Sequence, residues 1–211
     1  MQILKVPQTQ NLSSNTYCQD SISSLLTIGE SRSISMMKHL SLLLLLTLLT
    51  VTAHADVLTA AEDQFSIRIA VTVPTDRATA YRHFLNVGAW WNGDHTWFGN
   101  PSGLYIEPFA NGCFCEKNGD RTALHMTVSY VDPTNQIKMI GGLGPLQGLG
   151  LHGAMSFNFK SLTDDTTEVT HYYRVLGNVP EDLIELAPIV DSVQQLQMNS
   201  LENFIKKETS P

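Results

Sequence analysis

Two cysteines, a glutamate and a histidine crowd one short stretch of the chain, the segment GCFCEKNGDRTALH at residues 112–125. Thiolate, imidazole and carboxylate groups are the usual zinc ligands in proteins, and they also serve in acid–base and nucleophilic catalysis. Two neighbouring cysteines can also form a disulfide. Which of these is available depends on which side chains share a face, so the local structure has to be worked out first.

The pair Asn118-Gly119 separates two alternating segments and is the strongest short-range signal for a β-hairpin. Because side chains alternate along a strand, a two-residue loop at this pair fixes which residues share a face. The predicted cross-strand pairs are Lys117 with Asp120, Cys115 with Thr122, Cys113 with Leu124, and Gly112 with His125. In this register the cysteines face the core, whereas Glu116 and His125 lie on a solvated outer face. A three-residue loop or a bulge would reunite the cysteines with the histidine.

Three interpretations of Cys113 and Cys115 remain open. The first is two small hydrophobic side chains on the core face. The second is a disulfide between them, which would be strained and easily reduced because such residues lie near the upper limit of workable Cα separation, about 6.8 Å. The third is a thiolate or metal role. Two thiolates do not complete a tetrahedral zinc site, so no metal is expected.

The elements around this hairpin follow from hydrophobic periodicity. Residues 65–73 alternate as a half-buried strand, and Thr75 can cap a short helix that follows. From Gly103 onward, strands and turns continue until an amphipathic C-terminal helix, in which Pro188 predicts a break and a main helix beginning near Ile189. This order predicts an α+β fold, with an antiparallel sheet of about seven strands around a terminal helix and two short helices after the first strand.

Three segments resemble the START/Bet v1-like (SRPBCC) helix-grip superfamily, in particular its polyketide-cyclase-like and Hsp90-ATPase-activator-like bacterial members. They are VTVPTDRATAYRHFLNVGAWWNG, YIEPFANGCFCEK, and GGLGPLQGLGLHGAMSFNF followed by TEVTHYYRV. The resemblance covers about residues 65–205 and implies a cavity between the sheet and the terminal helix. Members of this superfamily bind lipids, sterols or polyketide-like aromatics, and only some are enzymes. The superfamily has no universal catalytic set to transfer.

Core-facing positions in this arrangement are the candidate ligand-binding residues. They are Cys113, Cys115, Met126, Val128, Tyr130, Met155, Phe157, His171, Tyr173 and Val193. The expected cavity mouth comprises Trp90, Trp91, Trp97 and His152. The segment GLGLHG matches a dinucleotide-binding pattern, but a strand rather than a helix follows it, so no cofactor is expected.

The N-terminal residues predict export. Residues 37–55 have the basic start, apolar run and small-residue cleavage site of a secretory signal peptide, which implies a periplasmic or secreted protein without stable membrane insertion. Residues 1–36 resemble an unstructured leader, with Met36 or Met37 as a possible true start, and residues 56–211 form one domain. The formal net charge of −7 argues against nucleic acid as a partner.

The leading hypothesis is therefore an exported protein that holds an apolar or aromatic molecule in its cavity. One alternative is a cyclase- or hydrolase-like enzyme that uses His171 with Tyr173. Another is a protein-interaction or co-chaperone-like module, which would require a large exposed apolar patch.

Overall fold

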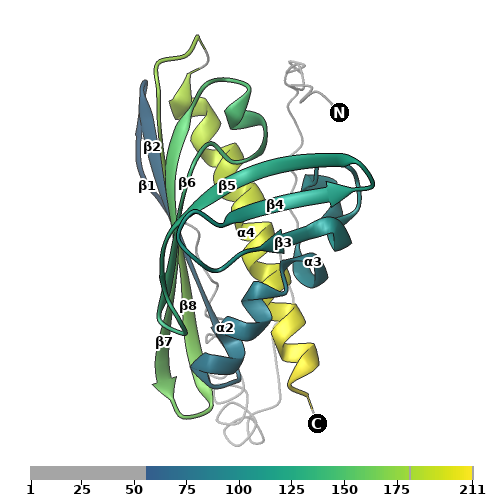
Figure 1. The fold of residues 1–211 in the computed structure, drawn as a ribbon. Helices are drawn as coiled ribbons and strands as arrows, with labels where there is room; N and C mark the ends of the chain where they lie inside the picture. Colours follow the sequence, from purple (N-terminus) through teal and green to yellow (C-terminus); the bar gives the residue numbers. More distant parts are fainter. Residues whose placement is uncertain (1–55, 181, 211) are drawn as a thin grey trace, which may run out of the picture. The chain divides into compact units, whose positions relative to one another are not determined.

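A curved antiparallel sheet provides most of the structure, and a long C-terminal helix lies along it (Figure 1). The computed structural model describes residues 56–180 and 182–210. The predicted leader, the signal peptide and the alternative starts at Met36 and Met37 lie outside these residues. Within the described ranges, no helix is both long enough and apolar enough to cross a membrane.

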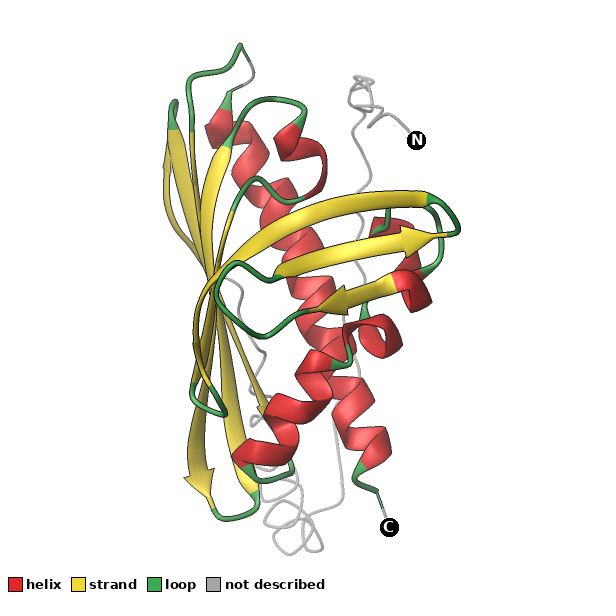
Figure 2. Ribbon diagram, viewed as in Figure 1, coloured by secondary structure: helices red, strands yellow, loops and turns green. Residues whose placement is uncertain are grey.

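The sheet has the strand order β1-β2-β8-β7-β6-β5-β4-β3, so all of its neighbours are antiparallel and most are consecutive hairpins. Its strands are β1 (Asp56–Ala61), β2 (Gln64–Val73), β3 (Leu104–Ile106), β4 (Cys113–Asn118), β5 (Arg121–Asp132), β6 (Gln136–Ile140), β7 (His152–Thr163) and β8 (Thr166–Leu176). The long strand β5 curves away from the plane of β2, β7 and β8 and carries β4 and β3 with it (Figure 2).

The helices are α2 (Arg77–Leu85), α3 (Val87–Trp90) and α4 (Leu183–Glu208), with short 3₁₀ turns η1 (Gly93–His95), η2 (Pro101–Gly103) and η3 (Gly144–Gln147). Helix α4 packs against β1 and β2, and it also contacts α2 and α3. The α+β prediction is confirmed, including the two short helices ahead of the main run of hairpins.

Two details of the predicted fold are wrong. The sheet has eight strands because β1, which was not predicted, pairs along β2. Helix α4 begins at Leu183 and runs through Pro188 without a break. The Asp182 carboxylate caps its start by accepting from the Ile184 N–H at 2.8 Å, and Leu183 and Ala187 are fully buried. Burial of this first turn therefore outweighs the local penalty of an internal proline.

Candidate functional site

The β4–β5 hairpin does have a two-residue loop, but the loop is Gly119-Asp120 rather than Asn118-Gly119. Asn118 pairs with Arg121, Lys117 with Thr122 and Cys115 with Leu124. Gly119 has a φ of 62°, the left-handed conformation that glycine adopts without strain. The ladder then shifts between Phe114 and Cys115, so that His125 becomes an extra residue on β5. The predicted register is wrong at both points.

This bulge decides which side chains face the core. Phe114 and Glu116 are buried, whereas Cys113 and Cys115 are only half-buried on the outer face. Leu124, the strand partner of Cys115, is also outside, with 51 % of its surface exposed. The predicted core-facing cysteines are therefore wrong, because that prediction assumed strict alternation from Leu124 through Met126 across the bulge.

The two cysteines are joined in a disulfide, and their Cα atoms are 5.4 Å apart. Two residues of an extended strand span about 6.6 Å, so the strand is shortened at this point. Of the three interpretations of Cys113 and Cys115, the disulfide is the one that applies, and it lies at the register shift of the hairpin. Among the described residues, no group of three potential metal ligands occurs.

Glu116 and His125 form a buried pair, contrary to the predicted solvated face. The His125 Nε2 atom lies 3.1 Å from Glu116 Oε2, and their side chains are 3 % and 0 % exposed. The Glu116 carboxylate also accepts from the backbone N–H groups of Trp97 at 2.8 Å and Phe98 at 2.9 Å. The pair is buried because the bulge turns His125 inward, to the same side of the sheet as Glu116. The pair anchors residues 91–100, which carry Trp97 and Phe98 and which we call the aromatic loop, to the sheet.

His125 is further held by its ring stacking on Phe114, with the centroids 4.8 Å apart. Burial lowers the pKa of His125, and the neighbouring Glu116 opposes this shift. Since both oxygens of Glu116 already accept hydrogen bonds, this carboxylate has a structural role in positioning residues 97 and 98.

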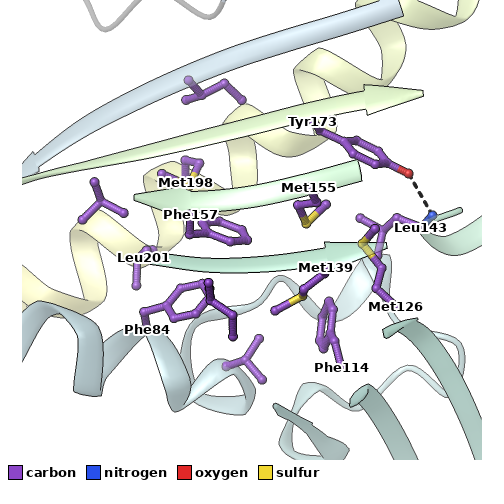
Figure 3. Packing of buried hydrophobic residues seen from close by; sticks show 14 of the residues in the cluster. Phe84, Phe114, Met126, Met139, Leu143, Met155, Phe157, Tyr173, Met198 and Leu201 are labelled. Atoms are coloured by element: carbon purple, nitrogen blue, oxygen red, sulfur yellow. Dashed lines mark hydrogen bonds between the residues drawn. The ribbon is translucent and has the colours of Figure 1, made fainter. Parts of the chain in front are cut away.

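The interior holds a small apolar space, which we call the inner hollow. Its volume is about 10 Å³, room for about one water molecule. It lies between α2–α3 and β6–β7 rather than directly beneath α4, and Figure 3 shows Phe84, Met139, Met155, Phe157 and Phe114 gathered in this region. Its lining residues are Phe84, Val87, Trp90, Trp91, Ile106, Phe114, Met139, Met155 and Phe157.

Trp90 and Trp91 line the inner hollow instead of bordering a mouth. Both are buried, and their indole N–H groups donate to the backbone oxygens of Phe84 and His95, each at 3.0 Å. Since each large ring gains the most by burying its apolar surface, these hydrogen bonds let both tryptophans enter the core. Trp97 remains outside, 40 % exposed.

His171 is the most unusual polar group in the interior. It is fully buried on β8, stacks on Phe157 with a centroid distance of 4.6 Å, and neither ring nitrogen makes a hydrogen bond of ordinary geometry. Burial lowers the pKa of His171 to about 4, although the Ser156 backbone and the Gln194 side chain oppose the shift. The imidazole is therefore neutral at pH 7 and retains unused hydrogen-bonding capacity.

Tyr173 does not pair with His171. Its hydroxyl accepts from the Leu143 N–H at 3.0 Å and lies 3.5 Å from the Gly141 carbonyl oxygen (Figure 3). Burial raises the pKa of Tyr173 to about 12, so the hydroxyl keeps its proton. The rings of His171 and Tyr173 lie side by side on β8, with their centroids 6.5 Å apart, but the hydroxyl and the imidazole are not joined by the hydrogen bond that the enzymatic alternative requires.

The remaining predicted site residues divide between the interior and the surface. Met126, Val128, Met155 and Phe157 are buried. Tyr130 is 46 % exposed, because a second register shift between Val128 and Tyr130 turns it to the outer face, where Lys138 lies 5.1 Å over its ring. Val193 is only half-buried, because its neighbour Gln194 occupies the core face of α4.

His152 is exposed and lines a second space, the surface hollow, of about 240 Å³. This hollow lies among β5, β6 and the η3 loop. Its lining residues are Leu124, His125, Met126, Thr127, Ile140, Gly141, Gly142, Gln147, Gly150, Leu151 and His152.

Comparison with solved structures agrees with this arrangement of a curved sheet and long helix. A protein of unknown function from Enterococcus faecalis is 11 % identical, with a TM-score of 0.53 over 74 % of this chain and 80 % of that one. A Mesorhizobium loti protein is 10 % identical, with a TM-score of 0.50 over 69 % of this chain and 99 % of that one. The fold is the helix-grip fold.

Sequence comparison adds no closer assignment for this helix-grip chain. No family model and no curated protein matches the sequence. The aromatase/cyclase di-domain BexL is 13 % identical, with a TM-score of 0.49 over 69 % of this chain and 48 % of that one. At such identities the similarity to the Enterococcus faecalis and Mesorhizobium loti proteins establishes the fold alone, and the predicted resemblance is confirmed at that level.

Sequence reasoning missed two buried glutamines of the helix-grip core. Gln194 and Gln197 are 3 % and 1 % exposed on α4. The Gln197 side chain accepts a hydrogen bond from the Asn92 N–H and makes another with His95 Nδ1, each at 2.9 Å. These contacts attach the aromatic loop to α4. The available signal was their helical phase, since both share the face of Met198 and Leu201.

Proposed function

We propose that this protein binds a small apolar or aromatic molecule in the inner hollow, and that the molecule carries one hydrogen-bonding group directed to His171. The helix-grip fold typically binds hydrophobic ligands. The observation that carries the proposal is the fully buried imidazole, whose two nitrogens lie near the Ser156 backbone and the Gln194 side chain but make no hydrogen bond of ordinary geometry. An unsatisfied buried polar group costs about 1–3 kcal/mol, and a ligand that pairs with it removes this cost.

Binding has to enlarge the inner hollow, because about 10 Å³ is far below the roughly 300 Å³ of an ordinary ligand pocket. The lining favours such repacking at Met139 and Met155, since unbranched, polarisable methionine side chains adapt to new shapes at little cost. Phe157 lines the inner hollow and also stacks on His171, so it lies next to both.

The first test is fluorescence titration with 1-anilinonaphthalene-8-sulfonate in a Trp97→Phe background, in which the remaining tryptophans line the inner hollow. Met155→Ala should tighten binding several-fold because it creates space in advance. Met198→Ala is the matched control, since Met198 is equally buried but does not line the hollow. Equal effects of the two substitutions on the affinity for the probe, or no binding of the probe at all, would refute the proposal.

Identification of the natural ligand follows from native mass spectrometry of protein purified from its own host. His171→Leu should weaken binding of that ligand about tenfold, and it should leave binding of a purely apolar analogue unchanged. Equal effects on both ligands would contradict a polar contact through the imidazole.

We also propose that the chain is exported, on the strength of the apolar run and small-residue site at residues 37–55. N-terminal sequencing of the mature protein from its host should begin at Asp56. An N-terminus upstream of residue 37 would contradict export by this signal.

A further inference from the structure

The Cys113–Cys115 disulfide contributes little to holding the fold together. It joins two residues of one strand, and β4 is already paired to β3 on one side and β5 on the other. The stabilisation that a disulfide supplies increases with the length of chain it encloses, and here only Phe114 lies between the bridged residues. The bridge therefore links no separate parts of the molecule.

The surroundings of the bridge suit a reaction at the surface. Both cysteines are half-buried on the outer face of the sheet. Leu124 and Tyr105, the strand partners of Cys115, are 51 % and 41 % exposed. Thr127, the partner of Cys113, pairs on its other side with Ile140, which is 51 % exposed.

These neighbours continue into the surface hollow of about 240 Å³, because Leu124, Thr127 and Ile140 are among its lining residues. The disulfide thus lies at the edge of an open depression large enough for a small organic molecule. Exposed disulfides are the ones that exchange with thiols, whereas inaccessible structural ones resist reduction.

We propose that Cys113 and Cys115 form a thiol–disulfide exchange site for an apolar dithiol. The thiolate of the dithiol bonds to the Sγ atom of one cysteine, and the Cys113–Cys115 bond breaks. The released cysteine leaves as a thiolate and takes up a proton. The second thiol of the reagent then displaces the first cysteine, so the protein is reduced to two thiols and the dithiol is oxidised to a cyclic disulfide.

The test uses a Cys18→Ser background, so that Cys113 and Cys115 are the only cysteines. The oxidised protein is incubated with dithiothreitol in native buffer and in 6 M guanidinium, alkylated with iodoacetamide, and weighed intact. We expect addition of two alkyl groups in native buffer, at a rate within about tenfold of that in denaturant. After dithiothreitol is removed, and without alkylation, oxidised glutathione should restore the bridge, and the urea midpoint should stay nearly the same in the reduced protein.

Preference for an apolar partner is tested with 1,4-butanedithiol, which lacks the hydroxyl groups of dithiothreitol. Its native rate, divided by its rate in guanidinium, should exceed the same ratio for dithiothreitol several-fold. Equal ratios would refute the apolar preference. Reduction only in denaturant, unfolding on reduction, or two thiols that oxidised glutathione cannot close would each overturn the exchange site.

Discussion

Replacing His171 by leucine should change how the stability of this protein depends on pH. In the folded protein, burial lowers the pKa of His171 from 6.5 to about 4. In the unfolded chain the imidazole takes up a proton below about pH 6.5, but in the folded protein it does so only below about pH 4. Protons therefore favour the unfolded state between these values, and the wild-type protein loses stability as pH falls through this window.

The size of the effect follows from the same shift. Each unit of pKa difference corresponds to about 1.4 kcal/mol, so full protonation of the unfolded state costs the wild-type protein roughly 3 kcal/mol by pH 4. His171→Leu removes this term. At pH 7 we expect the two proteins to agree within about 1 kcal/mol, because loss of the stack on Phe157 offsets removal of the unpaired nitrogens.

The assay is urea unfolding, followed by tryptophan fluorescence at half-unit steps from pH 7 to pH 4. The informative quantity is the variant free energy of unfolding minus the wild-type value at each pH, because titration of all other groups, including the buried His125, cancels. It should rise by roughly 3 kcal/mol towards pH 4. His152→Leu is the control, since this exposed side chain should produce no such rise. A difference that stays constant from pH 7 to pH 4 would refute a buried, neutral His171.

Substitutions at three further positions test other contacts by urea unfolding. Glu116→Ala should lower the free energy of unfolding by at least about 3 kcal/mol, because it leaves two backbone N–H groups and an imidazole without their acceptor. Glu116→Gln should lower it less, and equal losses in the two variants would contradict this role of the carboxylate. Pro188→Ala should stabilise the protein by about 1–3 kcal/mol, because alanine restores an N–H donor inside α4, and a loss of stability would show that proline is required there. Gly153→Ala should cost about 1–3 kcal/mol, because its methyl group would overlap the Tyr173 ring, and a neutral result would mean that the ring moves easily.

The alternating and amphipathic patterns were sufficient to predict the fold. Alternation over residues 65–73 matches β2, whose residues Phe65, Ile67 and Ile69 are all fully buried. The helical spacing of the C-terminal residues likewise matches the buried face of α4. Such patterns are reliable because burial of one face repeats over many residues, so a single exception does not change the outcome.

The candidate site was harder to predict, because bulges reverse the alternation on which face assignments depend. One register shift turned His125 inward and left the cysteines outside, and another turned Tyr130 outward. A bulge depends on pairing with the neighbouring strand, so the alternation within one strand does not reveal it. The buried Glu116–His125 pair and its anchoring of the aromatic loop are consequences of the first shift.

The sequence by itself determined the order of the elements from β2 onward, the hairpin near Gly119 and the inward position of His171, because each depends on local periodicity or turn chemistry. The tertiary structure decided where the inner hollow lies, that α4 continues through Pro188, and that the His171 nitrogens make no hydrogen bond of ordinary geometry. It also decided the chemistry of the opening segment. Cys113 and Cys115 form a half-buried disulfide there because Phe114 and Glu116 occupy the inner face, and that choice depends on packing against residues distant in sequence.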